Sequence, residues 1–199
     1  MKKLSFANLP PFAIADGATT PNPGFSGVWA WSTTLSLPVL WDGTKWSDYT
    51  PGANTVVLAS DVTNNNATAN TIADVTGLSF PVTAGQRYKF KFFITYSAAA
   101  TTTGSRWSIN GPATTLLAYR SDYSLTATSR TFNNGQNAYN LPAAANATSA
   151  VVAAANMAVI EGMITPSASG SVIARFASSV LSSAIVAKAG QSYVEYSTY

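Results

Sequence analysis

Residues 88 to 96 restrict the fold of this chain more than any other segment. Every second position in this stretch carries a large apolar side chain: Tyr88, Phe90, Phe92, Ile94 and Tyr96. Most of the positions between them are polar, with two lysines and a threonine. Because successive side chains of a β-strand point to opposite faces, the pattern predicts a strand with one face in a hydrophobic core.

The rest of residues 53–199 indicates further short strands separated by turn residues. We predict strands at residues 55–60, 72–82, 106–110, 115–121, 125–132, 157–165, 171–178 and 191–199, and a turn at Ala84-Gly85. The alanine-rich stretch 142–156 lacks a clean amphipathic period, and we interpret it as a loop in preference to a helix. Many short strands with frequent turns predict an all-β fold, a jelly-roll-like antiparallel β-sandwich.

Two different segments precede this sandwich. Residues 1–27 contain four prolines and three glycines, which oppose both a helix and a central strand. We expect an extended N-terminal arm that anchors the chain to another surface, since such a segment has no core of its own. Residues 28–52 contain four of the five tryptophans and form the second predicted segment, a small tryptophan-rich β-hairpin module. The predicted domains are therefore 1–27, 28–52 and 53–199.

The hairpin module is predicted from the dipeptide Asp42-Gly43, which lies between alternating apolar residues. Asp-Gly favours the type I′ turn of a two-residue hairpin loop, because that turn needs positive φ at both central positions. Such a loop would pair Val39 with Trp46. The pairing would place Trp41 and Trp46 on one face of the hairpin.

A second hairpin is predicted around the turn at residues 166–170. If it is symmetric about Ala168, Glu161 lies opposite Arg175, and the residues around this pair are largely apolar. A strand that is apolar on both faces is usually buried on both, so we expect one face to be covered by another subunit. The alternative is an ion pair within one chain. The predicted oligomer interface consists of Val159, Glu161, Met163, Ile173 and Arg175.

The chain has no histidine and no cysteine. Their absence excludes disulfides, thiolate nucleophiles, Cys/His zinc sites and histidine acid–base chemistry. The eight Asp and Glu residues form no recognisable motif. We therefore predict no catalytic, cofactor-binding or metal-binding residues, and no enzymatic activity. The enzymatic alternative is a polysaccharide depolymerase, which would need a pair of carboxylates.

Charged residues make up only 10% of the chain, against about 25% in an average protein. The eleven basic residues are scattered, so no nucleic-acid-binding patch is expected. No apolar run approaches the roughly 18 residues of a membrane span, and prolines at positions 10 and 11 interrupt the apolar start of the chain. We expect neither membrane insertion nor a secretion signal.

Two stretches carry a resemblance to known proteins. Residues 29–48, WAWSTTLSLPVLWDGTKWSD, resemble a short module near the ends of tailed-bacteriophage fibre and tail proteins. Residues 58–199 are similar to a recurring β-rich surface domain of phage virion proteins. That similarity rests on three blocks in order: LASDVTNNNATANTIADVTGLSFPVTAGQRYKFKF, TTTGSRWSINGPA and EGMITPSASGSVIARFASSV.

The resemblance implies a structural protein of the virion surface, assembled in the host cytoplasm. Such a protein would be a short head fibre, a capsid decoration protein or a tail-tip fibre subunit, commonly a homotrimer. It would dock through its N-terminal arm on capsid or tail proteins and could attach to a host surface. A free carbohydrate-binding module, with aromatic rings that stack on a host glycan, is a further alternative.

Overall fold

The computed structural model describes residues 13–14, 29–32, 37–41, 46–48, 54–126, 128–139 and 156–199. Within these ranges the regular elements are all β-strands, which confirms the predicted all-β class. No helix in these ranges is long and apolar enough to cross a membrane. The contacts divide the chain into two units, Met1–Gly52 and Ala53–Tyr199, which are described separately below.

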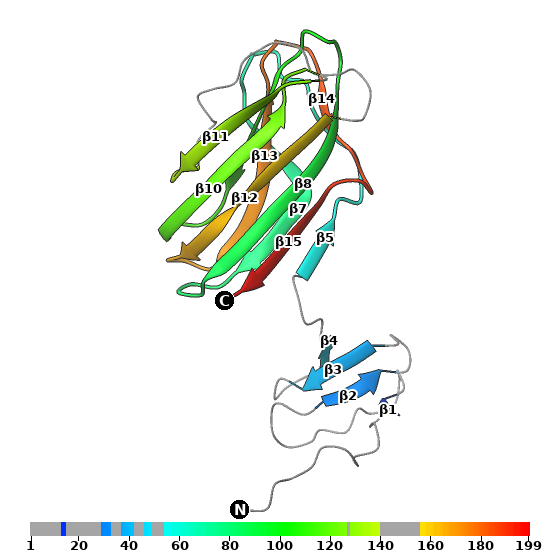
Figure 1. Cartoon of the computed structure of the whole chain (residues 1–199), viewed down its shortest axis with the longest axis vertical. Coiled ribbons are helices and arrows are strands. Elements are labelled where there is room, and N and C mark those ends of the chain that lie inside the picture. Colours follow the sequence, from blue (N-terminus) through cyan, green and yellow to red (C-terminus); the bar gives the residue numbers. More distant parts are fainter. Residues whose placement is uncertain are drawn as a thin grey trace, which may run out of the picture. The chain divides into compact units, whose positions relative to one another are not determined.

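The first unit contains a sheet with the strand order β1-β2-β3-β4 (Figure 1). Its strands are β1 (Ala13–Ile14), β2 (Trp29–Ser32), β3 (Leu37–Trp41) and β4 (Trp46–Asp48). β1 pairs with β2 in parallel, whereas β2, β3 and β4 pair antiparallel. Two residues of the predicted arm therefore pair with the hairpin module. The remainder of residues 1–27 lies outside the described residues.

The predicted register of the tryptophan hairpin is wrong by two residues. Trp41 lies opposite Trp46, and Val39 lies opposite Asp48. Four positions, 42–45, thus separate the paired tryptophans, and Asp42 and Gly43 are outside the described residues. An Asp-Gly dipeptide locates a reversal of the chain, but hairpins also use longer loops, so the dipeptide alone does not determine which residues face each other.

The second unit is a two-layer sandwich (Figure 1). Its large sheet has the order β11-β10-β12-β8-β14-β6, and β15 pairs with both β8 and β5. The small sheet has the order β7-β13-β9. The pairs that the structure describes in this unit are antiparallel, as predicted for a jelly-roll-like fold. The strands are β5 (Asn54–Val57), β6 (Val62–Asn64), β7 (Ala73–Val82), β8 (Tyr88–Ala98), β9 (Ser105–Asn110), β10 (Thr114–Ser124), β11 (Arg130–Gln136), β12 (Asn156–Pro166), β13 (Gly170–Ser178), β14 (Ile185–Ala187) and β15 (Tyr193–Thr198).

The core lies between the two sheets, and β8 contributes more of its aromatic side chains than any other strand. The alternation predicted for this strand is confirmed, because its core-facing residues from Tyr88 to Tyr96 are at most 6% exposed. Phe92 lies 6.0 Å from Phe80 of the small sheet, measured between ring centroids, and Tyr96 lies 4.9 Å from Trp107. These contacts join the two layers.

Several predicted boundaries differ from the structure. The predicted strand 125–132 is wrong, because β10 ends at Ser124 and β11 begins at Arg130. Between them the hydroxyl of Thr126 accepts a hydrogen bond from the backbone N–H of Ser129 at 3.0 Å. The strands β6 and β14, three residues each, were not predicted. Of the stretch 142–156, only Asn156 lies within the described residues, where it begins β12.

The predicted hairpin at residues 157–178 is also wrong. β12 lies between β10 and β8 in the large sheet, whereas β13 lies between β7 and β9 in the small sheet. The turn at residues 167–169 therefore carries the chain from one layer to the other. Each strand lies between two neighbours of its own sheet, so the apolar composition of the two strands does not require a pairing between them.

Candidate functional site on the outer face of the large sheet

The surface of the large sheet that points away from the small sheet is called the outer face here. Strand β12 shows the division: Ala158, Ile160 and Ile164 are buried, and the residues between them point outward. Three residues of the predicted interface lie on this face, namely Val159, Glu161 and Met163.

The other two predicted interface residues lie on the opposite side of the sandwich. Ile173 and Arg175 belong to β13, where the alternate positions Val172, Ala174 and Phe176 are buried. Arg175 lies 2.7 Å from Asp74 of the neighbouring strand, measured from Nε to Oδ1. The predicted pairing of Glu161 with Arg175 is therefore wrong, and the five residues do not form one surface. Whether either group contacts another subunit remains a prediction.

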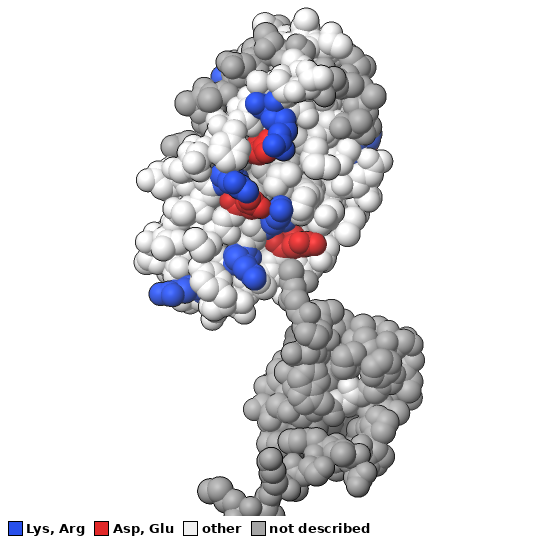
Figure 2. Space-filling model, viewed as in Figure 1, with Lys and Arg blue, Asp and Glu red and all other residues white. Residues whose placement is uncertain are grey.

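Four charged residues form a row across the outer face. Arg120 lies opposite Glu161, Glu161 opposite Lys91, and Lys91 opposite Glu195, on the adjacent strands β10, β12, β8 and β15. We call these four residues the charge row. Its signs alternate from one strand to the next, and Figure 2 shows the alternation on an otherwise largely uncharged surface.

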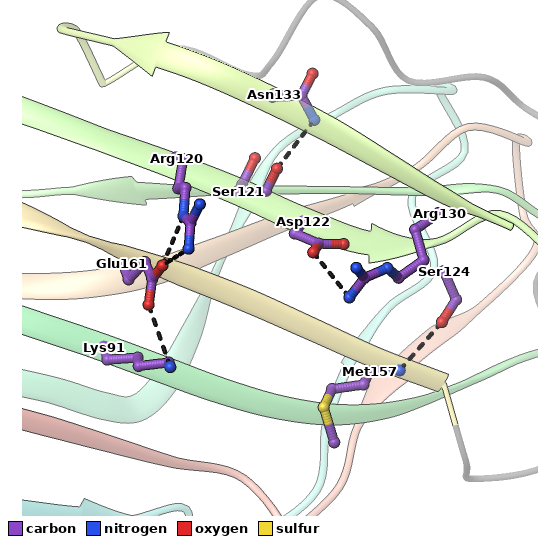
Figure 3. A network of polar contacts seen from close by, with 9 residues as sticks. All are labelled: Lys91, Arg120, Ser121, Asp122, Ser124, Arg130, Asn133, Met157 and Glu161. Atoms are coloured by element: carbon purple, nitrogen blue, oxygen red, sulfur yellow. Dashed lines mark hydrogen bonds and ion pairs between the residues drawn. The ribbon is translucent and has the colours of Figure 1, made fainter.

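Glu161 is the centre of an ion-pair network. Its Oε1 accepts a hydrogen bond from Arg120 Nε at 2.6 Å, and its Oε2 lies 3.2 Å from Lys91 Nζ (Figure 3). Partial burial raises the pKa of Glu161, but the hydrogen bonds from Arg120 and Lys91 outweigh burial and leave the pKa below its ordinary value. Glu161 is therefore ionised at neutral pH.

A second ion pair lies beside the charge row. Asp122 Oδ2 lies 3.0 Å from Arg130 Nη1 (Figure 3). The other carboxylate oxygen, Oδ1, is buried and has no hydrogen-bond partner among the described residues. A buried oxygen without a hydrogen-bond partner costs free energy.

Next to the charge row lies a row that is mainly apolar. It runs across six strands, with Asp122 as its one charged member. We call it the apolar row; in strand order it consists of Phe132, Asp122, Val159, Phe93, Tyr193 and Val57. The rings of Phe93 and Tyr193 are stacked, with centroids 4.9 Å apart. Lys91 Nζ lies 4.6 Å from the Phe93 ring centroid, so the two rows contact each other.

Exposed apolar side chains gather on this same face. Among the described residues seven large apolar side chains are exposed, and Leu181 is the one that lies elsewhere. The strand registers place five of the other six on the outer face. The sixth, Tyr199, follows β15 and contacts this face, because its hydroxyl lies 3.3 Å from the sulfur of Met163. The six are Val57, Leu116, Phe132, Met157, Met163 and Tyr199. A concentration of this kind is typical of a surface that contacts another molecule.

The outer face is hollowed in two places. The larger hollow has a volume of about 630 Å³ and lies over the charge row, with Asn134 and Met163 in its lining. The smaller, about 300 Å³, lies between Asp122, Phe132 and Val159. No group of three acidic residues that could hold a metal ion occurs in the described part of the chain. The face offers hydrogen-bonding charges and apolar side chains, which suits binding.

Sequence reasoning missed three members of the site, Lys91, Arg120 and Glu195. Lys91 was predicted to point away from the core, because it alternates with the aromatic residues of β8. Its partners come from strands that are 29 to 104 positions away in the sequence, so only the strand order brings the four charges together. The residues predicted for the hairpin module, from Trp41 to Trp46, belong to the other unit.

The chain has only weak similarity to known proteins. No family model matches the chain, and no curated protein matches it. Among solved structures, the infectious bursal disease virus Gx strain matches with a TM-score of 0.28 and 10% identity, over 80% of this chain and 45% of the other. The VP2 subviral particle of infectious bursal disease virus matches with a TM-score of 0.22 and 8% identity, over 81% and 43%. This chain spans less than half of either viral chain, and no functional argument rests on these similarities.

Proposed function

We propose that this chain is a non-enzymatic structural subunit of a virus particle, a short bacteriophage surface appendage that assembles with copies of itself. The resemblance of residues 29–48 and 58–199 to phage surface modules supports the location on a virion. The outer face of the large sheet is the observation that carries the self-association, because it combines exposed apolar side chains with a row of paired charges.

The distribution of charge supports a binding role for this face. Ala53–Tyr199 contains thirteen charged residues, eight basic and five acidic. Seven of them lie on the outer face: Lys89, Lys91, Arg120, Asp122, Arg130, Glu161 and Glu195. In a chain with so few charges, this gathering of charges together with six exposed apolar side chains resembles the mixed composition of a protein interface.

Catalysis is disfavoured by the ionisation state of Glu161. A glycosidase-type acid must hold a proton near neutral pH, which requires a raised pKa. Glu161 instead has a lowered pKa because of its two cationic neighbours. We expect no release of reducing ends from host polysaccharide. Turnover that disappears when Glu161 or Glu195 is replaced by Gln would favour the depolymerase alternative.

Location is tested by immunogold microscopy of intact phage particles. We expect label on the particle surface, with a capsid position indicating decoration or a head fibre and a tail-tip position indicating a fibre subunit. Deletion of residues 1–27 is expected to abolish the label, since we propose that the arm docks on other virion proteins. Absence of the full chain from particles would contradict the proposal.

The resemblance further implies a homotrimer and attachment to a host surface. Native mass spectrometry of the purified chain counts the subunits. The hollow of about 630 Å³ is also compatible with a host glycan, because its lining combines the polar residues Asn134, Glu195 and Ser197. Calorimetric titration with host surface polysaccharide tests this second role, and no measurable binding would exclude it.

A further inference from the structure

We propose that the outer face binds the outer face of a second copy of this chain, around a two-fold axis parallel to the strands. This inference rests on the proposed self-association and names its geometry. The axis would pass between β12 and β8, the two strands at the centre of the charge row. Two features of the outer face lead to this geometry: the order of its charges and the ends of its apolar row.

The order of the charges is complementary to its own reversal. Read across the strands, Arg120, Glu161, Lys91 and Glu195 have the signs plus, minus, plus, minus. A two-fold axis parallel to the strands reverses this order in the second copy. Arg120 then meets Glu195 of the second copy, and Glu161 meets Lys91. An axis across the strands would instead place each charge on its own equivalent, which is repulsive.

Glu195 is the member of the charge row that gains most from this arrangement. Among the described residues it has no ion-pair partner in its own chain, although it lies opposite Lys91. The two-fold arrangement supplies a guanidinium, which pairs with a carboxylate through strong charge-assisted hydrogen bonds. The two-fold axis generates this contact twice, so Glu195 of each copy pairs with Arg120 of the other.

The same axis matches the two ends of the apolar row. Phe132 on β11 and Val57 on β5 are each three strands from the centre, and they are 53% and 54% exposed. Reversal places Phe132 on Val57 of the second copy, which removes both from water.

The size of the face is sufficient for a stable contact. The face is six strands wide, with about 4.8 Å between strands, and its central strands are about 35 Å long. Because the outer strands are shorter, the area of the face is on the order of 800 Å² per copy. This equals the area of a standard protein interface, and two sheets pack face to face at about 10 Å. The row itself has no net charge, so the contact requires no third component.

A two-fold contact produces even numbers of copies. It therefore departs from the three copies that the resemblance implies, unless three such dimers join into a hexamer. The test uses the full chain, with native mass spectrometry and sedimentation at micromolar concentration. We expect the wild type to be a dimer or a hexamer.

The critical variants are Val57→Lys and Phe132→Glu. Each alone should raise the dissociation constant of the dimer at least tenfold, because it places a charge against an apolar side chain of the second copy. The double variant should regain the wild-type dissociation constant to within a few-fold, because the lysine introduced at position 57 of one copy then pairs with the glutamate introduced at position 132 of the other. Within one chain these positions are five strand spacings, about 24 Å, apart, so the rescue cannot arise intramolecularly.

The control variant is Leu181→Glu, which also charges an exposed apolar side chain but lies off the outer face. It should leave the dissociation constant unchanged, and all four variants should keep the wild-type circular dichroism spectrum, which shows that the fold is intact. A wild-type trimer without even-numbered species would overturn the two-fold contact but leave self-association standing, whereas a monomer would overturn both. Single variants without effect, or a double variant without rescue, would also overturn the proposed geometry.

Discussion

At the scale of single residues, Gly162 is the position on β12 with the least room for a side chain. A Cβ atom there would lie 2.3 Å from the backbone oxygen of Ala118 and 2.5 Å from the Cβ of Tyr119. Neither atom can move without shifting β10. We expect Gly162→Ala to lower the free energy of unfolding by about 3 kcal/mol, measured by urea denaturation of the full chain.

The matched control is Gly135→Ala. Nothing lies within 4 Å of a Cβ atom at this position, and its φ is +66°, so the substitution costs only the strain of the left-handed backbone. That strain is about 1 kcal/mol. Equal losses in the two variants would contradict an additional cost from the close approach of β10 and β12 at Gly162.

Glu161 should make the free energy of unfolding depend on pH. Its ordinary pKa is 4.5, and its pKa in the folded protein is lower. As pH falls below about 4.5, the unfolded chain takes up this proton before the folded chain does, so the free energy of unfolding decreases. Thermal melts from pH 7 to pH 3 should show this loss. The loss should be smaller in Glu161→Gln, and an identical pH profile in the two proteins would exclude this contribution.

At the scale of elements, β8 separates a core face from the outer face. Phe92 is fully buried, whereas its neighbour Phe93 points outward and stacks on Tyr193. We expect Phe92→Ala to lower the free energy of unfolding by about 3 to 5 kcal/mol and Phe93→Ala by about 1 kcal/mol. Urea denaturation measures both. Similar losses for the two would contradict the division of the strand into two faces.

Long strands with a clear period could be predicted from the sequence, whereas their partners could not. The alternation in β8 is set by local chemistry, because every core-facing position carries a large apolar side chain. The partner of β12 is set by a layer change at residues 167–169, and a turn of that composition fits a hairpin equally well. β6 and β14 have three residues each, too few to show a period.

The candidate site was predictable only in part for the same reason. Val159, Glu161 and Met163 were placed on an interface face because their strand is apolar on both sides. Their neighbours Lys91, Arg120 and Glu195 depend on the order β10-β12-β8-β15, which no local pattern contains. Arg175 was assigned to the same face because its strand follows β12 in the chain, although it belongs to the other layer.

At the scale of the whole molecule, Ala53–Tyr199 contains its own core. The buried cluster from Leu58 to Val194 draws all its described members from this unit. We therefore expect residues 53–199, produced without residues 1–52, to fold with a cooperative thermal transition and the far-ultraviolet circular dichroism of a β-protein. A truncated chain that lacks a cooperative transition would show that this unit depends on the first one.

The order of the strands has a consequence for the synthesis of this protein on the ribosome. One edge of β8 is covered by β14 and β15, which end at residue 198, about 100 residues after β8 itself. Throughout the translation of that interval the most aromatic strand of the chain has emerged with this edge unpaired, and unpaired apolar edges promote aggregation. We therefore expect the sandwich to form only after β15 has left the ribosome.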